Sequence, residues 1–314
     1  MSIDRQATVA AIQLDTDIGN TYKNLAACAR LVEEAVSSGA RWIGLPEFFN
    51  TGISWQPDLV NAIEFEDGRS ARLLCELSKK YSVVLGGSFL CRLSNGAVKN
   101  RYLCFDHGEL VGRHDKDIPT MWESAFYEAG EDDGVIGNID GIRVGAAVCW
   151  EFMRTQTAKR MAGKVDIIMG GSHWWSLPTN WPQSLLMGSE CQNIENAIRS
   201  VQETAKLIGA PVVHASHCNT FSCKLPGIPF LKYDGELEGN TAIIDAQGNI
   251  LSIRRKEEGE GVVLASVELK NINPSEKIPR RYWLRNRTAL ATFAWHYQRL
   301  LGSSWYKKNV KKSY

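Results

Sequence analysis

Residues 142–151 read IRVGAAVCWE, an apolar run rich in small side chains that stops at a cysteine. We predict a buried strand over residues 142–148, because a short apolar run of this length fits a strand covered on both faces. A helix is expected to follow, to about residue 162. Such a strand-to-helix elbow exposes the side chain of Cys149 and points backbone N–H groups toward it. The start of a helix also favours a thiolate.

Two further apolar segments lead into reactive side chains. Residues 41–45 (RWIGL) run through a proline into Glu47, and a hairpin predicted from residues 101–105 and 109–113 leads into Lys116. The carboxyl ends of strands are where sites assemble in α/β sheets. Burial raises the pKa of a carboxyl group toward the range of a general base, and a lysine stabilises a carbonyl oxygen that becomes negative.

The rest of the chain alternates helices and strands, which indicates the α/β class. Helices are predicted near residues 21–37, 70–80 and 190–208, and strands at 7–13, 83–87, 165–169, 211–215, 240–244, 250–254 and 262–267. No break in composition separates two halves, so we assign residues 1–273 to one domain. Residues 274–314 hold three tryptophans and a basic end, and we interpret them as a C-terminal extension that packs on the domain or on a partner subunit.

Composition excludes several classes of function. The chain has 314 residues, 44% of them hydrophobic, and 36 basic against 35 acidic residues leave a net charge of +1. This balance gives no electrostatic reason to expect nucleic acid or a membrane surface as a partner. Residues 1–14 lack the pattern of a signal peptide, so we expect a cytoplasmic protein with its eight cysteines reduced.

Taken singly, each of these side chains has a plainer interpretation, because a cysteine packs as a small hydrophobe and lone charges are usually solvated. Their order, Glu then Lys then Cys, is more specific. The segments LPEFFNTG (45–52), GRHDKDIPTMWESAFYEAG (112–130) and AAVCWE (146–151) resemble the motifs of the nitrilase superfamily. The resemblance implies a four-layer α-β-β-α sandwich. It also implies a homodimer or higher homo-oligomer, joined through the helix after Cys149 and the helix at 190–208.

The resemblance also implies a mechanism. Glu47 takes the thiol proton of Cys149 and passes it to the leaving nitrogen, while Lys116 and the backbone N–H of Trp150 hold the developing negative charge. Glu123 orients the base, the lysine or the substrate. A thioester acyl-enzyme forms and water hydrolyses it, releasing a carboxylic acid and ammonia or an amine. The expected partner is a small-molecule amide or nitrile, and no metal or cofactor is expected.

The residues after the cysteine leave the bond under attack open. Many amidases of the superfamily continue with an acidic residue and Arg-Phe-Pro-Glu, whereas this chain continues WEFMR, and its Cys-Trp-Glu triplet is closer to nitrilases proper. We favour an amide, with a nitrile as the alternative. His173, Trp174 and Trp175 follow the predicted strand at 165–169, and we expect them, with Trp150, to line the substrate pocket; the alternative is that the tryptophans only pack at the sheet edge.

Two other chemistries use the same residues. A papain-like pair would join Cys149 to His173 or His214. A metal-binding protein without enzymatic activity would use the cluster His214, His217, Cys218 and Cys223, whose side chains are all zinc ligands in other proteins, although their spacing is not that of a standard zinc finger.

Overall fold

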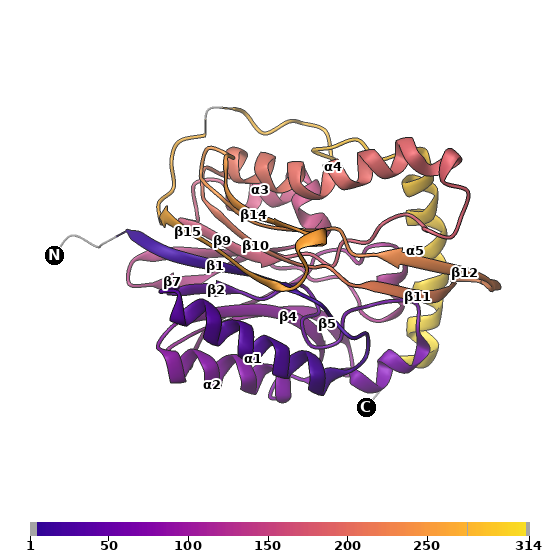
Figure 1. Cartoon of the computed structure of the whole chain (residues 1–314), viewed down its shortest axis with the longest axis horizontal. Helices are drawn as coiled ribbons and strands as arrows, with labels where there is room; N and C mark the ends of the chain where they lie inside the picture. Colours follow the sequence, from indigo (N-terminus) through magenta and orange to yellow (C-terminus); the bar gives the residue numbers. More distant parts are fainter. Residues whose placement is uncertain (1–4, 275, 312–314) are drawn as a thin grey trace.

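The computed structural model describes residues 5–274 and 276–311. Two β-sheets pack face to face, with α1 and α2 on one side and α3 and α4 on the other (Figure 1). This is the four-layer α-β-β-α sandwich that the resemblance to the nitrilase superfamily implied. The first residues of segment 1–14 and the last residues of the basic end lie outside the described part of the chain.

The first sheet has the order β6-β5-β4-β2-β1-β15. Its inner strands β1, β2 and β4 run parallel, and its outer strands β5, β6 and β15 are antiparallel to their neighbours. The short strand β3 pairs with the end of β4. The strands are β1 Gln6–Leu14, β2 Trp42–Gly44, β3 Glu64–Phe65, β4 Val84–Arg92, β5 Val98–Asp106, β6 Glu109–Asp115 and β15 Gly261–Glu268.

The second sheet repeats this plan in the order β7-β8-β9-β10-β13-β14, with β8, β9 and β10 parallel. The last residues of β1 pair with the last residues of β10, so the sheets meet at the carboxyl ends of their central strands. The strands are β7 Val135–Ile139, β8 Ile142–Val148, β9 Ile167–Gly171, β10 Val212–His217, β13 Gly239–Ile244 and β14 Ile250–Arg255. A separate hairpin of β11 Thr220–Leu225 and β12 Ile228–Glu236 projects beyond this meeting point (Figure 1).

Three apolar cores hold the layers together. One lies between the sheets, a second between the first sheet and helices α1 and α2, and a third between the second sheet and helices α3 and α4. The helices are α1 Thr21–Ser37, α2 Arg69–Tyr81, α3 Thr155–Met161, α4 Gln183–Ile208 and α5 Ala289–Asn309, with 3-10 helices η1 Pro57–Ala62, η2 Met121–Ala125, η3 Cys149–Met153 and η4 Lys256–Glu258. No helix in residues 5–274 or 276–311 combines the length and apolarity needed to cross a bilayer.

The C-terminal segment forms a helix that the sequence analysis did not predict. Helix α5 lies across one end of the sandwich and packs on η2 (Figure 1). Gly302 permits this contact, because a Cβ there would overlap the side chain of Ser124. The hydroxyl oxygen of Tyr306 on α5 accepts a 2.9 Å hydrogen bond from the backbone N–H of Val98. The division into a domain of residues 1–273 and an extension of 274–314 stays a prediction.

Candidate active site

Four ionisable side chains meet at the carboxyl ends of three strands. Glu47 follows β2, Lys116 follows β6, Cys149 follows β8, and Glu123 lies in η2. All four side chains are buried. The Nζ atom of Lys116 lies 2.8 Å from Oε1 of Glu47 and 2.7 Å from Oε2 of Glu123. Carboxylate oxygens of Glu47 and Glu123 and the sulfur of Cys149 lie within 4.8 Å of one another. We call these four residues the Glu–Lys–Cys cluster.

Glu47 is placed to act as a base. Its carboxylate accepts hydrogen bonds of 2.8 Å from Asn100 Nδ2, from the backbone N–H of His173 and from Lys116. Burial raises the pKa of Glu47 to about 7, with Lys116 opposing the rise and Glu123 adding to it. A carboxyl group with a pKa near neutrality can both take and return a proton at neutral pH.

Cys149 begins η3 with φ at +53°, a left-handed conformation that is unusual for a residue with a side chain. This backbone turns the chain sharply out of β8, so that the thiol projects toward Glu47. Burial raises the pKa of the Cys149 thiol well above its usual value, and the charge of Glu47 adds to this while Lys116 opposes it. The resting residue is therefore a neutral thiol beside a base, rather than the preformed thiolate expected from a helix start.

Lys116 supplies the positive charge of the cluster. Burial opposes that charge, but Glu123 and Glu47 outweigh burial and hold the pKa of Lys116 well above its usual value. Oε2 of Glu123 also accepts hydrogen bonds from the backbone N–H of Thr120, at 2.8 Å, and from the hydroxyl of Tyr127. Oε1 of Glu123 is buried and has no hydrogen-bond partner among the described residues.

A second group of charged side chains, buried except for Asp132, lies next to this cluster. The carboxylate of Glu151 accepts hydrogen bonds from the backbone N–H groups of Val148 and Asp117, at 2.7 and 2.9 Å, and contacts Nε2 of His114 at 2.8 Å. The other nitrogen of His114 pairs with Asp132, and Arg154 pairs with Asp117. We call His114, Asp117, Asp132, Glu151 and Arg154 the supporting network.

The supporting network joins the segment of Lys116 to the elbow of Cys149. Burial alone would lower the pKa of His114, but Glu151 and Asp132 raise it to about 10. Burial alone would raise the pKa of Glu151, but His114 and Arg154 bring it below its usual range. Both groups are therefore charged at neutral pH, and their attraction fixes the two strand ends relative to each other.

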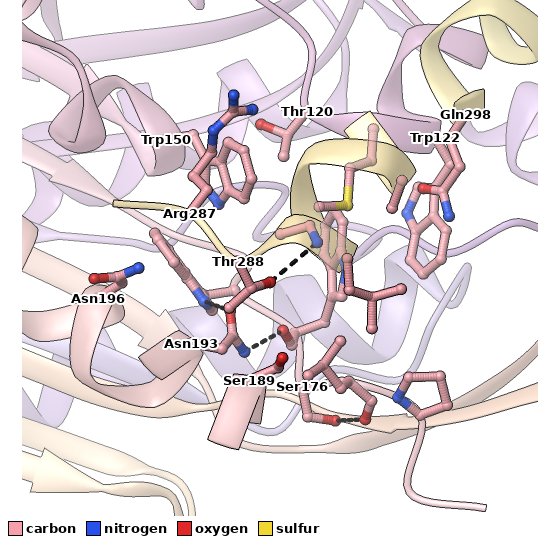
Figure 2. A pocket seen from close by; sticks show the side chains of 18 of the residues that line it. Thr120, Trp122, Trp150, Ser176, Ser189, Asn193, Asn196, Arg287, Thr288 and Gln298 are labelled. Atoms are coloured by element: carbon pink, nitrogen blue, oxygen red, sulfur yellow. Dashed lines mark hydrogen bonds between the residues drawn. The ribbon is translucent and has the colours of Figure 1, made fainter. Parts of the chain in front are cut away.

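An aromatic pocket opens beside Cys149, with about 890 Å³ of empty space including its mouth (Figure 2). The structure places all four predicted pocket residues, Trp150, His173, Trp174 and Trp175, in its lining. The tryptophans also pack on one another, since the Trp150 and Trp174 ring centroids are 5.9 Å apart. Lining the pocket and packing at the sheet edge are thus not exclusive. Trp122, which stacks on Trp175 with 4.7 Å between centroids, is a lining residue that the sequence analysis missed.

Other contributors to the site also escaped sequence reasoning. Asn100 on β5 contacts Glu47, and Tyr127 contacts Glu123, yet neither residue type stands out in the sequence. Trp122 and Tyr127 belong to segment 112–130, which resembles a family motif. Their position in that motif is the sequence signal that could have placed them at the site. Arg287 and the face of α5 reach the pocket from the far end of the chain, and no local pattern indicates this.

The structure does not support the papain-like alternative. His214 uses Nε2 to contact Ser172 and Nδ1 to contact the backbone carbonyl of Asn240. His173 accepts a hydrogen bond at Nε2 from the backbone N–H of Ile53, so its proton is assigned to Nδ1. Burial and His217 hold the pKa of His173 well below its usual value. A neutral imidazole with its free N–H in the pocket is a hydrogen-bond donor and not a base.

The zinc alternative lacks its two histidine ligands. His217 contacts Thr16 through Nδ1 and the backbone carbonyl of Glu47 through Nε2, so both of its ring nitrogens are engaged, as are those of His214. Among the described residues, the group with ligand atoms close enough for a metal is Glu47, Glu123 and Cys149. There the ammonium group of Lys116 already contacts both carboxylates and supplies the compensating positive charge.

The fold and the buried thiol, carboxylate and lysine together define an enzyme that cleaves carbon–nitrogen bonds. Residues 8–277 match the family model described as carbon-nitrogen hydrolase, and the chain belongs to that family. The predicted membership of the nitrilase superfamily is thereby confirmed.

Relatives of the chain include both amidases and nitrilases. The chain is 26% identical to a 2-oxoglutaramate amidase of Bacillus subtilis (strain 168) over 281 residues, which is 87% of this chain and 95% of the relative. It is 23% identical to a nitrilase of Bacillus sp. (strain OxB-1), covering 86% of this chain and 80% of the relative. A carbon-nitrogen hydrolase from Helicobacter pylori G27 shares the fold, with a TM-score of 0.72, 16% identity and coverage of 85% of this chain and 90% of that one.

Proposed function

We propose that the protein is an amidase that cleaves a small, non-peptide amide through a thioester on Cys149. One observation carries the proposal. The thiol of Cys149 lies within 4.8 Å of the carboxylates of Glu47 and Glu123, and Lys116 bridges those carboxylates. Nucleophile, base and cation are thus within reach of one small carbonyl group. The similarity to a 2-oxoglutaramate amidase supports an amide as the substrate.

The first half of the reaction forms the acyl-enzyme. Glu47 takes the proton of the Cys149 thiol as the sulfur attacks the amide carbon, which avoids a free buried thiolate. The carbonyl oxygen becomes negative and is held by the ammonium group of Lys116 and by the backbone N–H after the nucleophile. Glu47 then gives its proton to the amide nitrogen, the carbon–nitrogen bond breaks, and ammonia or an amine leaves.

The second half hydrolyses the thioester. Glu47 takes a proton from a water molecule as the water oxygen attacks the thioester carbon, and it returns that proton to the sulfur when the carboxylic acid leaves. Glu123 keeps Lys116 in place, because its Oε2 atom accepts a 2.7 Å hydrogen bond from Nζ. One lysine beside two carboxylates gives the cluster a net negative charge. Protonation of Glu47 neutralises that charge.

Intact mass spectrometry tests the proposal directly. The protein is mixed with a panel of carbamoyl compounds, ω-amides, aryl amides and nitriles, and quenched with acid before deacylation is complete. We expect an adduct with the mass of the acyl group on the wild-type chain and none on Cys149→Ala. Cys191→Ala is the matched control, because Cys191 is an exposed free thiol and its loss should leave the adduct intact. An adduct that persists on Cys149→Ala, or none with any compound, would contradict the proposal.

A nitrilase is the second candidate function. The Cys-Trp-Glu triplet at residues 149–151 and the similarity to a Bacillus nitrilase favour it. Both activities give a carboxylic acid and ammonia, so the substrate must discriminate between them. Paired compounds with one acyl group, such as benzamide and benzonitrile, should show higher kcat/KM for the amide. A preference for the nitrile across several pairs would replace the amidase proposal.

We further propose that the enzyme works as a homodimer in the cytoplasm. Large apolar side chains are exposed on the outer helices, among them Leu185 and Met187 on α4 and Phe293 and Leu300 on α5. Contact with a second copy would bury them. All eight cysteines are free thiols, in keeping with a reducing compartment. A monomeric mass in solution scattering would contradict the dimer, and fractionation of the source cells tests the location.

A further inference from the structure

Part of the pocket wall comes from a segment that follows residues 8–277, the part of the chain that matches the family model. That match ends at residue 277, whereas Arg287, Thr288 and several residues of α5 line the pocket (Figure 2). Trp295 on α5 stacks on Trp150, the residue after the nucleophile, with 5.2 Å between ring centroids and the planes 7° apart. The C-terminal segment therefore lies against the substrate space itself, where it can determine which amide is accepted.

Of the described residues that line this pocket, Arg287 is the one with a charged side chain. It forms no ion pair with any described carboxylate, and its buried Nη1 atom has no acceptor there. Arg285, two residues earlier, differs in pairing with both Glu195 and Glu203. Burial lowers the pKa of Arg287, as expected for a cation without a partner. An unpaired guanidinium that faces a pocket has N–H donors free to bind an anion.

The aromatic surroundings hold this guanidinium in place. Its central carbon lies 4.0 Å from the ring centroid of Trp283 and 5.7 Å from that of Trp295. Stacking on these rings orients the planar group before any ligand arrives and leaves its N–H edge for a carboxylate. Through Trp295 and Trp150, the guanidinium is linked by direct ring contacts to the elbow of Cys149.

Other polar atoms of the pocket are also buried without partners. They are Oγ1 of Thr120, Nε1 of Trp122, Nδ1 of His173 and Oε1 of Gln298, and all four residues line the cavity. Buried polar groups are normally hydrogen-bonded in proteins, so several unsatisfied ones around one cavity indicate a polar ligand. Among the described residues, no carboxylate side chain lines the cavity. Thr120, Trp122 and His173 can donate to an anionic, oxygen-rich molecule, while Oε1 of Gln298 can accept from an N–H group such as that of an amide.

We propose that Arg287 binds a carboxylate on the acyl part of the substrate, so that the enzyme selects monoamides of dicarboxylic acids over neutral amides. This inference rests on the proposed amidase function. It assigns a specificity-determining role to Arg287, at the opposite end of the substrate from Cys149.

Matched substrate pairs test the assignment. Succinamate, glutaramate and adipamate are compared with butanamide, pentanamide and hexanamide, which have the same chain lengths and a methyl group in place of the carboxylate. The variants are Arg287→Met, which keeps an apolar group against the tryptophans, and Arg287→Lys, which keeps the charge without the planar fork. Arg281→Gln is the control, because Arg281 is exposed and its loss removes the same charge nearby.

The wild-type enzyme is expected to prefer the carboxylate member of at least one pair. Arg287→Met should lower kcat/KM for that substrate about 100-fold and change the neutral partner by less than about 3-fold, given the strength of charge-assisted hydrogen bonds. Arg287→Lys should retain part of the preference, and Arg281→Gln all of it. Equal losses on both members of a pair would mean that Arg287 only packs against the tryptophans, and would overturn the proposal.

A binding measurement separates this proposal from the amidase function. Glutarate is titrated into the wild-type protein and into Arg287→Met, with tryptophan fluorescence as the readout, because several tryptophans line the pocket. Weaker binding to Arg287→Met supports the carboxylate site even if no amide is hydrolysed, an outcome in which only the amidase proposal fails. Equal affinity in both proteins, or none in either, contradicts the carboxylate site whatever the enzyme hydrolyses.

Discussion

The Glu–Lys–Cys cluster and the supporting network share two strand ends, and their side chains are buried except for that of Asp132. His114 and Lys116 stand two residues apart at the end of β6, and Cys149 and Glu151 stand two residues apart after β8. The pKa values of their buried glutamates Glu47 and Glu151 nevertheless shift in opposite senses. The pKa of Glu151 is lowered, so it stays charged beside His114, whereas the pKa of Glu47 is raised, which favours its neutral form.

Charge compensation explains the difference. Glu47 and Glu151 each make three short polar contacts, but Glu151 faces two cations, His114 and Arg154. Glu47 shares the single cation of Lys116 with Glu123, whose Oε1 atom has no partner among the described residues. A buried carboxylate whose charge is fully compensated stabilises structure, while one that shares its cation is left able to exchange a proton.

The largest expected effect comes from removing the base. Glu47→Gln keeps the shape of the side chain and its hydrogen bond from Asn100, but it cannot take the thiol proton. We expect kcat/KM to fall about 10²–10⁴-fold, the usual contribution of a general base, in a variant that remains folded. Steady-state kinetics and thermal unfolding of the same preparation measure both.

The wild-type pH profile gives an independent check on this base. In the proposed mechanism Glu47 acts in its deprotonated form, so kcat/KM should rise with pH through about 7, where its carboxyl group loses its proton. Full activity at pH 5, or near wild-type turnover by Glu47→Gln, would show that another group is the base.

The second largest effect is expected from a change in the supporting network, which should lower the stability of the fold and, through it, the activity. Glu151→Gln leaves the imidazolium of His114 with one carboxylate and weakens the link between the Lys116 segment and the Cys149 elbow. We expect the free energy of unfolding to fall by about 3 kcal/mol, as for other broken buried ion pairs. Chemical denaturation measures the loss. Glu131→Gln, an exposed site, is the control, and equal stability of the two variants would refute a structural role for the supporting network.

The smallest effect is a pH dependence of stability from His114. Its pKa is raised from 6.5 to about 10 on folding, so between these values the native state keeps a proton that the unfolded state has lost. This stabilisation is complete below pH 6.5 and is lost as pH rises toward 10. We expect the free energy of unfolding to fall by about 1–2 kcal/mol between pH 7 and 8.5. In His114→Gln the decline should flatten, and an unchanged slope would exclude His114 as its source.

Sequence patterns predicted the α/β class of the fold. They also indicated that the strands before Glu47, Lys116 and Cys149 end close to one another. The apolar runs leading to Glu47, Lys116 and Cys149 end at one site because parallel strands share an edge. The elbow itself was predicted less well. A 3-10 helix, η3, starts at Cys149 and α3 starts only at Thr155, so the expected continuous helix was wrong. Glu151 binding back to the amide of Val148 explains the tighter turn.

Features that depend on contacts between residues distant in the sequence could not be predicted from it. Asn100 carries no motif, and its contact with Glu47 exists only because β5 and β2 lie on either side of β4. The helix α5 was missed because its apolar residues face several partners at once, so that no single stripe marks it. Arg287 is one of many arginines in the sequence, and only the folded chain shows that it lacks a carboxylate.

The packing of α5 on η2 has a consequence for protein synthesis. Glu123 lies in η2, and the glycine contact at Gly302 brings the last helix against that same turn. Translation proceeds from the amino terminus, so Glu47, Lys116 and Cys149 are synthesised while about half of the chain, α5 included, is still unmade. We expect a nascent chain stalled before residue 289 to hold its thiol without the finished pocket, and to become competent only when the final helix emerges and docks.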